Sequence, residues 1–200
     1  AEQLCSQIEE RLKILEKVED KLLKKFLNIV FKPLYQDVKK WSMQQWPVNN
    51  LREILPKTKQ TLSPSDFGFH NSILRSEGAL CFLDLEYFGW DDPAKLVSDF
   101  LLHPGMNLND EMRQQFYKGA QSVFGAGDAR FQARFEALYP LFGLCWCLIT
   151  LNEFLPAIWA RRSAASGGFN PDLAQTAQLE KARRMLANIE ESLENGPDFT

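Results

Sequence analysis

The sequence SPSDFGFHNSILRSEGALCFLDLEYFGWDDPAKLVSDFLLHPG, residues 63–105, places polar residues capable of chemistry between short apolar runs, which no other part of the chain does. Residues 72–75 and 80–84 are two strand-like runs, and Ser76-Glu77-Gly78 separates them. Glycine supplies the permissive backbone that a tight turn needs. The pattern therefore predicts an antiparallel hairpin formed by these two runs.

Polar side chains stand at both ends of this predicted hairpin. Asn71 comes just before the first strand, and Asp84 ends the second. Because a tight hairpin returns its two ends to one edge, we expect Asn71 and Asp84 to lie side by side, with Asp66 facing both. An Asn–Asp pair offers the hard oxygen ligands that suit Mg²⁺, which takes phosphate oxygens as further ligands. An aspartate shortly before the asparagine is where a phosphotransferase orients the accepting hydroxyl.

The order Asp-x4-Asn, hairpin, Asp-x-Glu and Asp-Pro over residues 60–105 resembles the aminoglycoside phosphotransferase and choline kinase family, which has the protein-kinase-like fold. The resemblance implies that Asp66 is catalytic and that Asn71 and Asp84 bind Mg²⁺. It also implies ATP as the phosphoryl donor and a small-molecule hydroxyl as the acceptor. Three further residues would support the site: Glu86, His70 and Asp92.

Two departures separate the chain from the usual family pattern. Pro64 and Ser65 stand where the family has His-Gly, and Lys95 stands where an aspartate is common. The missing histidine is usually a structural support for the loop, so no reacting group is lost. Taken singly, Asp66 and Asn71 are also ordinary turn residues before a strand, so the prediction depends on the whole set.

The same residues also fit a second register. Asp66-Phe67-Gly68 has the letters of the metal-binding triplet of protein kinases, which follows a His-Arg-Asp-x4-Asn loop. The residues upstream, Trp46-Pro47-Val48-Asn49-Asn50, contain no such loop. We therefore interpret the triplet as a coincidence within the other motif.

Composition fits one globular unit and argues against several functional classes. The chain has 200 residues, of which 45% are hydrophobic, enough for a core in one domain or one large lobe. A net charge of −3 gives no reason to expect a nucleic-acid partner. The four cysteines form no Cys-x2-Cys pair, so neither a disulfide framework nor a cysteine metal site is indicated. With no signal-peptide pattern at the start, we expect a cytoplasmic protein.

Apolar periodicity and capping signals predict helices over most of the remaining chain. We expect a helix over residues 2–46 that Pro33 kinks or ends near Phe31, and a connector over residues 47–62. Leu141–Leu151 lacks charge but is shorter than the roughly 18 residues of a membrane span, so a buried core helix is expected. Four further helices are predicted. The first begins at Asp92-Pro93, and the second runs from Asn109-Asp110 to about Phe124. The third runs from Asp128 to about Arg162 with kinks at Pro140 and Pro156, and the last covers residues 172–193.

The sequence as a whole predicts a mainly α protein with a small β-hairpin, α+β overall, similar to the large C-terminal lobe of the protein-kinase-like fold. A helical N-terminal segment (1–46) would precede the catalytic-loop and metal-hairpin region (60–105) and a helical subdomain (106–194). No segment resembling a small nucleotide lobe is visible, and the first residue is not Met, which suggests a trimmed or partial chain. Either a small lobe was removed or the protein never had one, and we expect this chain alone to be inactive.

Two functions follow from this reading of the residues. The first is an ATP- and Mg²⁺-dependent small-molecule kinase with neither nucleic acid nor membrane as partner. The alternative is a non-catalytic pseudokinase-like binding or scaffold module. The departure at Pro64-Ser65 and the missing small lobe favour the alternative, whereas the presence of Asp66, Asn71 and Asp84 together favours the kinase. The phosphate acceptor and the oligomeric state are left open.

Overall fold

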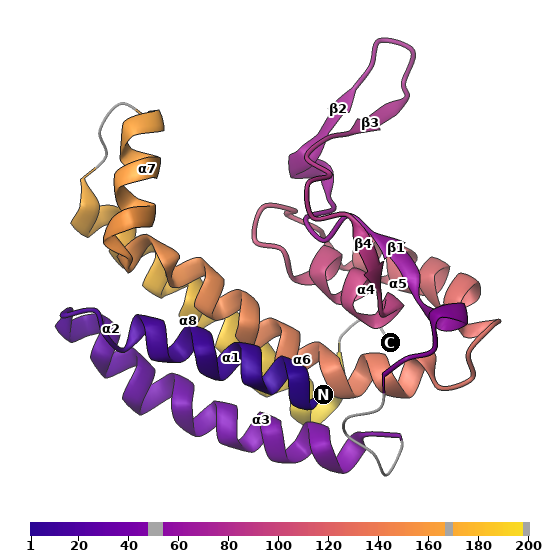
Figure 1. Ribbon diagram of the computed structural model, residues 1–200, viewed down its shortest axis with the longest axis horizontal. Helices are drawn as coiled ribbons and strands as arrows, with labels where there is room; N and C mark the ends of the chain where they lie inside the picture. Colours follow the sequence, from indigo (N-terminus) through magenta and orange to yellow (C-terminus); the bar gives the residue numbers. More distant parts are fainter. Residues whose placement is uncertain (48–53, 167–169, 198–200) are drawn as a thin grey trace.

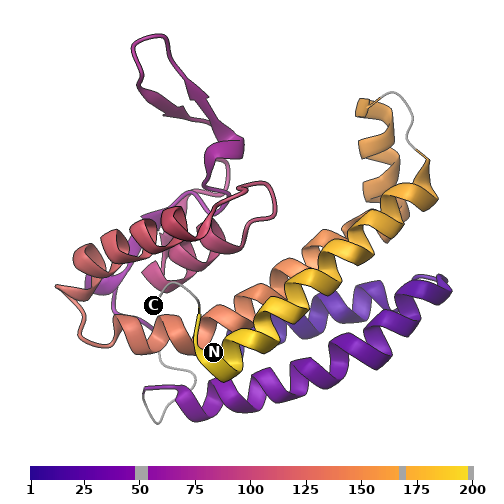
Figure 2. The same ribbon diagram turned by 180° about the vertical axis from the view of Figure 1, so that it is seen from behind.

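A computed structural model describes residues 1–47, 54–166 and 170–197. The fold is mainly helical with a small antiparallel β part, which confirms the predicted α+β class. Figures 1 and 2 show a body of long helices from which the hairpin projects at one end and α7 at the other. The α-helices are α1 (Glu2–Leu15), α2 (Lys21–Phe26), α3 (Lys32–Gln45), α4 (Pro93–Leu102), α5 (Asp110–Gly125), α6 (Phe131–Thr150), α7 (Pro156–Ser166) and α8 (Pro171–Asn195).

Helix α6 is the centre of the core and packs against α1, α3, α4 and α8. The uncharged run Leu141–Leu151 lies mostly within it and is largely buried, as predicted. By length and composition alone, Phe131–Phe154 could cross a membrane, with a mean hydropathy of 1.3, and it is the one such segment among the described residues. Because 72% of its apolar window is buried inside the protein, packing of the core accounts for its hydrophobicity.

The predicted break in the helical segment 2–46, near Phe31, is in the wrong place, because the chain turns after Leu15. Helix α1 ends at Leu15, and residues 16–20 reverse the chain so that α3 runs back beside α1 (Figure 1). Asp20 caps the next helix, since its carboxylate accepts a hydrogen bond of 2.7 Å from the Leu23 N–H. Near Pro33 the chain stays helical. A π-helical turn, Leu27–Phe31, joins α2 to α3 without a break, so Pro33 lies inside one continuous helical run. The π-helical turn falls just before Pro33, whose missing N–H interrupts the regular hydrogen bonds of the helix.

The predicted helix from Asp128 to Arg162 is also divided. Helix α6 continues through Pro140 but ends at Thr150, where a short 3₁₀ turn, Leu151–Phe154, follows. Pro156 then begins α7. The residue before a proline avoids the helical region, and Leu155 is indeed extended, with ψ of 121°.

The β structure consists of two antiparallel pairs. Strands β2 (Ser72–Leu74) and β3 (Leu80–Phe82) form the predicted hairpin, slightly shorter than expected, in the register Ile73 opposite Cys81. Gly78 has φ of +83°, the left-handed conformation for which the turn needs glycine. The second pair was not predicted: β1 (Thr61–Ser63) pairs with β4 (Gly89–Asp91).

Candidate functional site

The loop between β1 and β2 carries the predicted catalytic residue and is held by its own turns. Ser65 has φ of +64°, and the Ser65 N–H donates to Ser63 Oγ at 3.2 Å. The Asp66 N–H bonds the Pro64 carbonyl at 2.8 Å. Further along, a Cβ added to Gly68 would lie 2.4 Å from Met106 Sδ, so only glycine fits there without a shift. The loop is therefore pressed against the segment that follows α4.

The Asp66 carboxylate contacts two histidines. His70 Nε2 lies 2.8 Å from Asp66 Oδ1, and His103 Nε2 lies 3.5 Å from the same oxygen. The two imidazole rings stack with their centroids 3.7 Å apart and their planes 3° from parallel. The indole of Trp146, on α6, meets the His103 ring edge to face at 4.7 Å. His70, His103 and Trp146 thus form a short column of three rings, and the two imidazoles of this column contact the Asp66 carboxylate.

Burial sets the charge of this column. Burial is the largest cause and the nearby His70 adds to it, so that together they lower the pKa of His103 to about 4 although Asp66 opposes the shift. His103 is therefore neutral at pH 7. His70 and Asp66 remain partly accessible, with 19% and 37% of their side chains exposed.

Asn71 binds the main chain of Asp66. Its Nδ2 donates to the Asp66 carbonyl at 3.0 Å, which turns the amide so that Oδ1 is left for another partner. The Asn71 carbonyl accepts from the Leu83 N–H at 2.8 Å, so the ladder of the hairpin continues one step beyond β2 and β3. Asp84 is the next residue, and it therefore lies at the same end of the hairpin as Asn71, with its side chain exposed.

Backbone strain accompanies these residues. Three described non-glycine residues have positive φ, and two of them are Ser65 (+64°) and Asp84 (+57°), the third being Asn107. Holding a non-glycine residue in the left-handed region costs of order 1–3 kcal/mol, and such residues cluster at functional sites. The strain thus falls beside Asp66 and on Asp84 itself.

Glu86 lies on the exposed loop after β3. Its carboxylate raises the pKa of Tyr87 by accepting a hydrogen bond from the Tyr87 hydroxyl. The structure therefore places Glu86 beside an aromatic side chain at the surface.

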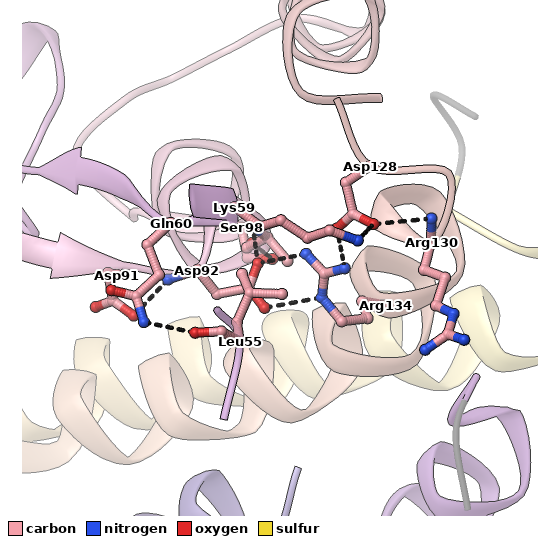
Figure 3. Close-up of polar contacts among 10 residues, drawn as sticks. Leu55, Lys59, Gln60, Asp91, Asp92, Ser98, Asp128, Arg130 and Arg134 are labelled. Atoms are coloured by element: carbon pink, nitrogen blue, oxygen red, sulfur yellow. Dashed lines mark hydrogen bonds and ion pairs between the residues drawn. The ribbon is translucent and has the colours of Figure 1, made fainter. Parts of the chain in front are cut away.

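Asp92 belongs to a separate, largely buried ion-pair cluster (Figure 3). Arg134 bonds both oxygens of Asp92, through Nε at 2.9 Å and Nη2 at 3.0 Å, and also bonds Asp128. Lys59 reaches Asp128 at 2.9 Å. Asp92 also caps α4 by accepting from the Ala94 N–H at 2.9 Å. Its observed contacts are structural: they fix the start of α4 against α6.

A cavity of about 750 Å³ opens beside this cluster, and Lys59, Asp91 and Arg130 are among the residues that line it. Asp66, Asn71 and Asp84 are absent from its described lining. The cavity is therefore separate from the predicted catalytic residues. Lys95, at the position where the family commonly has an aspartate, bonds Asp99 at 2.7 Å.

His103 is the site residue that the sequence did not reveal. Its position before Pro104-Gly105 indicates only the end of a helix, and no spacing relates it to Asp66 or His70. The fold nevertheless brings possible ligand atoms of Asp66, His70 and His103 within 4.8 Å of one another, the one such group among the described residues.

Comparison with known proteins assigns no family: no family model, curated protein or solved structure matches the chain. The resemblance described above therefore depends on the residues of 60–105 alone.

Proposed function

We propose that this chain is the catalytic lobe of an ATP- and Mg²⁺-dependent small-molecule phosphotransferase, similar to aminoglycoside phosphotransferases and with their protein-kinase-like fold. The observation that carries the proposal is the hydrogen bond from Asn71 Nδ2 to the Asp66 carbonyl. It ties the Asn71 side chain to the main chain of Asp66, so that one loop carries both a carboxylate suited to accept a proton and an amide oxygen suited to bind a metal.

The proposed reaction is an in-line transfer. The oxygen of the acceptor hydroxyl attacks the γ-phosphorus of ATP, and its proton passes to the Asp66 carboxylate. The bond between the γ-phosphorus and the bridging oxygen breaks, and ADP leaves with the electron pair. Asn71 Oδ1 and Asp84 would hold Mg²⁺, which when bound neutralises charge on the phosphates. Most of the rate enhancement would come from positioning and charge neutralisation.

Ser65 supports an active site in spite of the departure from His-Gly. The family glycine corresponds to Ser65, and Ser65 adopts a left-handed φ of +64°, a conformation that glycine takes without strain. Ser65 therefore adopts a conformation that a glycine at this position could also adopt.

The surface of the hairpin supports the presence of a second lobe in the full protein. Both faces of β2 are exposed, since Ile73 and the neighbouring Leu74 point to opposite sides and are 54% and 68% accessible. Further apolar side chains are exposed on β3, at Leu80, and on the loop that follows it, at Leu83, Leu85, Tyr87 and Phe88. An exposed apolar patch of this kind marks a binding surface, here for the base of the nucleotide and a covering lobe.

The test is Mg²⁺–ATP binding and turnover by the full encoded protein, measured as slow ATP hydrolysis when no acceptor is known. Asp66→Asn should leave folding and nucleotide binding nearly unchanged while the rate falls by about 10²–10⁴-fold, the usual effect of losing a positioned general base. Asp84→Asn should weaken Mg²⁺-dependent nucleotide binding as well as turnover. Glu77→Gln is the matched control, because Glu77 is an exposed carboxylate on the hairpin turn.

Two outcomes decide against the proposal. If the wild-type protein binds no Mg²⁺–ATP, the non-catalytic pseudokinase-like module becomes the better description. If it binds and turns over ATP but Asp66→Asn reacts at the wild-type rate, Asp66 is a turn residue and its catalytic assignment is wrong.

A further inference from the structure

The stacked histidines define a hydrogen-bond pattern around Asp66. The N–H of Gly105 donates to His103 Nδ1 at 3.1 Å. A ring nitrogen that accepts a hydrogen bond carries a lone pair and no proton. Neutral His103 must therefore carry its proton on Nε2, the nitrogen that lies 3.5 Å from Asp66 Oδ1.

The Nε2 atoms of both imidazoles lie close to the same carboxylate oxygen, Asp66 Oδ1. His70 Nε2 is at hydrogen-bond distance from Asp66 Oδ1, at 2.8 Å, and His103 Nε2 stands slightly beyond it. Hydrogen bonds of catalytic groups are often long without substrate and shorten in the reacting complex. Because both ring nitrogens lie nearest Oδ1, at 2.8 and 3.5 Å, the other oxygen, Oδ2, is the one left to meet a substrate.

We propose that His103 is a positioning residue that, together with His70, holds Asp66 through Oδ1 so that Oδ2 takes the proton of the acceptor hydroxyl. This inference rests on the proposed phosphotransferase function. His103 itself is held from three sides: by the Gly105 N–H, by the face of His70 and by the edge of Trp146. Trp146 is in turn fixed by a hydrogen bond of 2.9 Å from its Nε1 to Asp99. The support for Asp66 thus extends from the loop through α4 to α6.

A transition-metal site is the competing interpretation, because two imidazoles and a carboxylate are a common ligand set. A metal on His103 Nε2 would need the lone pair of that nitrogen and would move its proton to Nδ1. That proton would then face the Gly105 N–H, donor against donor. The hydrogen-bond pattern therefore favours a proton donor at Nε2 over a metal ligand.

The first experiment determines the tautomer of His103 in the 200-residue chain. Long-range ¹H–¹⁵N NMR correlations distinguish the two tautomers, and the chain has only two histidines, so His103→Phe assigns the signals. We expect the Nε2–H form at pH 7.5. The Nδ1–H form would overturn the proposal, and so would saturable Zn²⁺ binding that His103→Phe abolishes. This readout does not require activity, so it judges the positioning even if the phosphotransferase proposal fails.

The second experiment measures kinetics on the full encoded protein. His103→Phe keeps an aromatic ring for stacking but removes the donor, and we expect kcat to fall by about 10- to 100-fold with the KM for ATP within about twofold. His103→Gln, which retains an N–H donor near the position of Nε2, should recover part of the loss. Thermal unfolding of both variants controls for folding.

A double variant separates positioning from a general structural effect. If His103 acts through Asp66, His103→Phe should lower the residual rate of Asp66→Asn by less than about twofold. An equal drop in both backgrounds, or an unchanged kcat in the single variant, would contradict the role of His103. A wild-type protein without turnover would instead refute the proposed function.

Discussion

At the scale of single residues, the neutrality of His103 is a consequence of packing. The ring is 17% exposed, between His70 and Trp146, and cannot bind a proton without losing hydration that the buried site does not replace. Nδ1 is also already used as an acceptor for the Gly105 N–H. Protonation would therefore replace a hydrogen bond by a repulsive contact.

This neutrality predicts a pH-dependent stability. The unfolded chain binds a proton at His103 below its ordinary pKa of 6.5, whereas the folded chain keeps the ring neutral down to about pH 4. Between these values the unfolded state binds more protons, so the free energy of unfolding falls as the pH is lowered. From pH 7.5 to 5.0 we expect this group to contribute a loss of about 1 kcal/mol, less than the full shift implies because the ring is partly accessible to solvent.

The measurement is urea unfolding of wild type and His103→Gln at both pH values. The wild type should lose more stability than the variant by about that amount. Equal losses in the two proteins would show that His103 is protonated in the folded state, contrary to its buried environment.

At the scale of elements, the Asp92–Arg134–Asp128 cluster joins the start of α4 to the start of α6. Arg134 and Asp128 have 8% and 6% of their side chains exposed, so neither charge is well hydrated. Burial opposes ionisation of Asp128, but hydrogen bonds from Lys59 and Arg134 outweigh it and lower its pKa. The cluster is consequently stable only while its members are all present.

Arg134→Met is the variant that tests this dependence. It removes the shared cation and leaves two carboxylates poorly paired, so we expect a loss of about 3–5 kcal/mol in the free energy of unfolding. Lys24→Ala is the matched control: Lys24 pairs with Glu19 at the surface, and its removal should change stability by less than about 1 kcal/mol. Urea titration at pH 7 measures both, and similar small losses would mean that the buried cluster adds nothing beyond a surface pair.

At the scale of the whole molecule, α6 and α8 pack closely because Gly143 has no side chain. A Cβ at this position would lie 2.6 Å from Ile189 Cδ1 and 2.8 Å from Cγ1, both closer than atoms normally approach. Ile189 is 2% exposed and belongs to the core, so it has little room to move. The spacing of the two central helices therefore depends on this glycine.

A double-mutant cycle tests the contact. Gly143→Ala should destabilise the protein by about 1 kcal/mol, because overpacking outweighs the gain in helix propensity. Ile189→Ala should cost about 2–4 kcal/mol by leaving a cavity. The double variant should lose about 1–2 kcal/mol less than the sum, since the new methyl group fills part of that cavity.

Gly119→Ala is the control for helix propensity. Gly119 lies on the exposed side of α5, and an added Cβ would meet no atom within 4 Å. This substitution should stabilise the protein by about 0.5–1 kcal/mol. If Gly143→Ala stabilised it equally, the close packing of α6 on α8 would not be limiting. Chemical denaturation of the single and double variants provides these values.

The sequence by itself determined the features whose causes are local. The hairpin follows from two apolar runs around Gly78, and the start of α4 follows from Asp92-Pro93, because turns and caps are settled by residues within a few positions. The burial of Leu141–Leu151 follows from its lack of charge. Asp20 also carried a local signal for the turn after α1, but the continuous apolar periodicity on either side concealed it.

Only the tertiary structure decided which distant residues meet. The pairing of β1 with β4, the bond of Arg134 to Asp92 and the stacking of His103 on His70 all join positions that no periodicity relates. Each joins segments far apart in the sequence that only the folded chain brings together. The sequence could therefore propose Asp66 as the acting residue, while the fold alone brought His70 and His103 together beside its carboxylate.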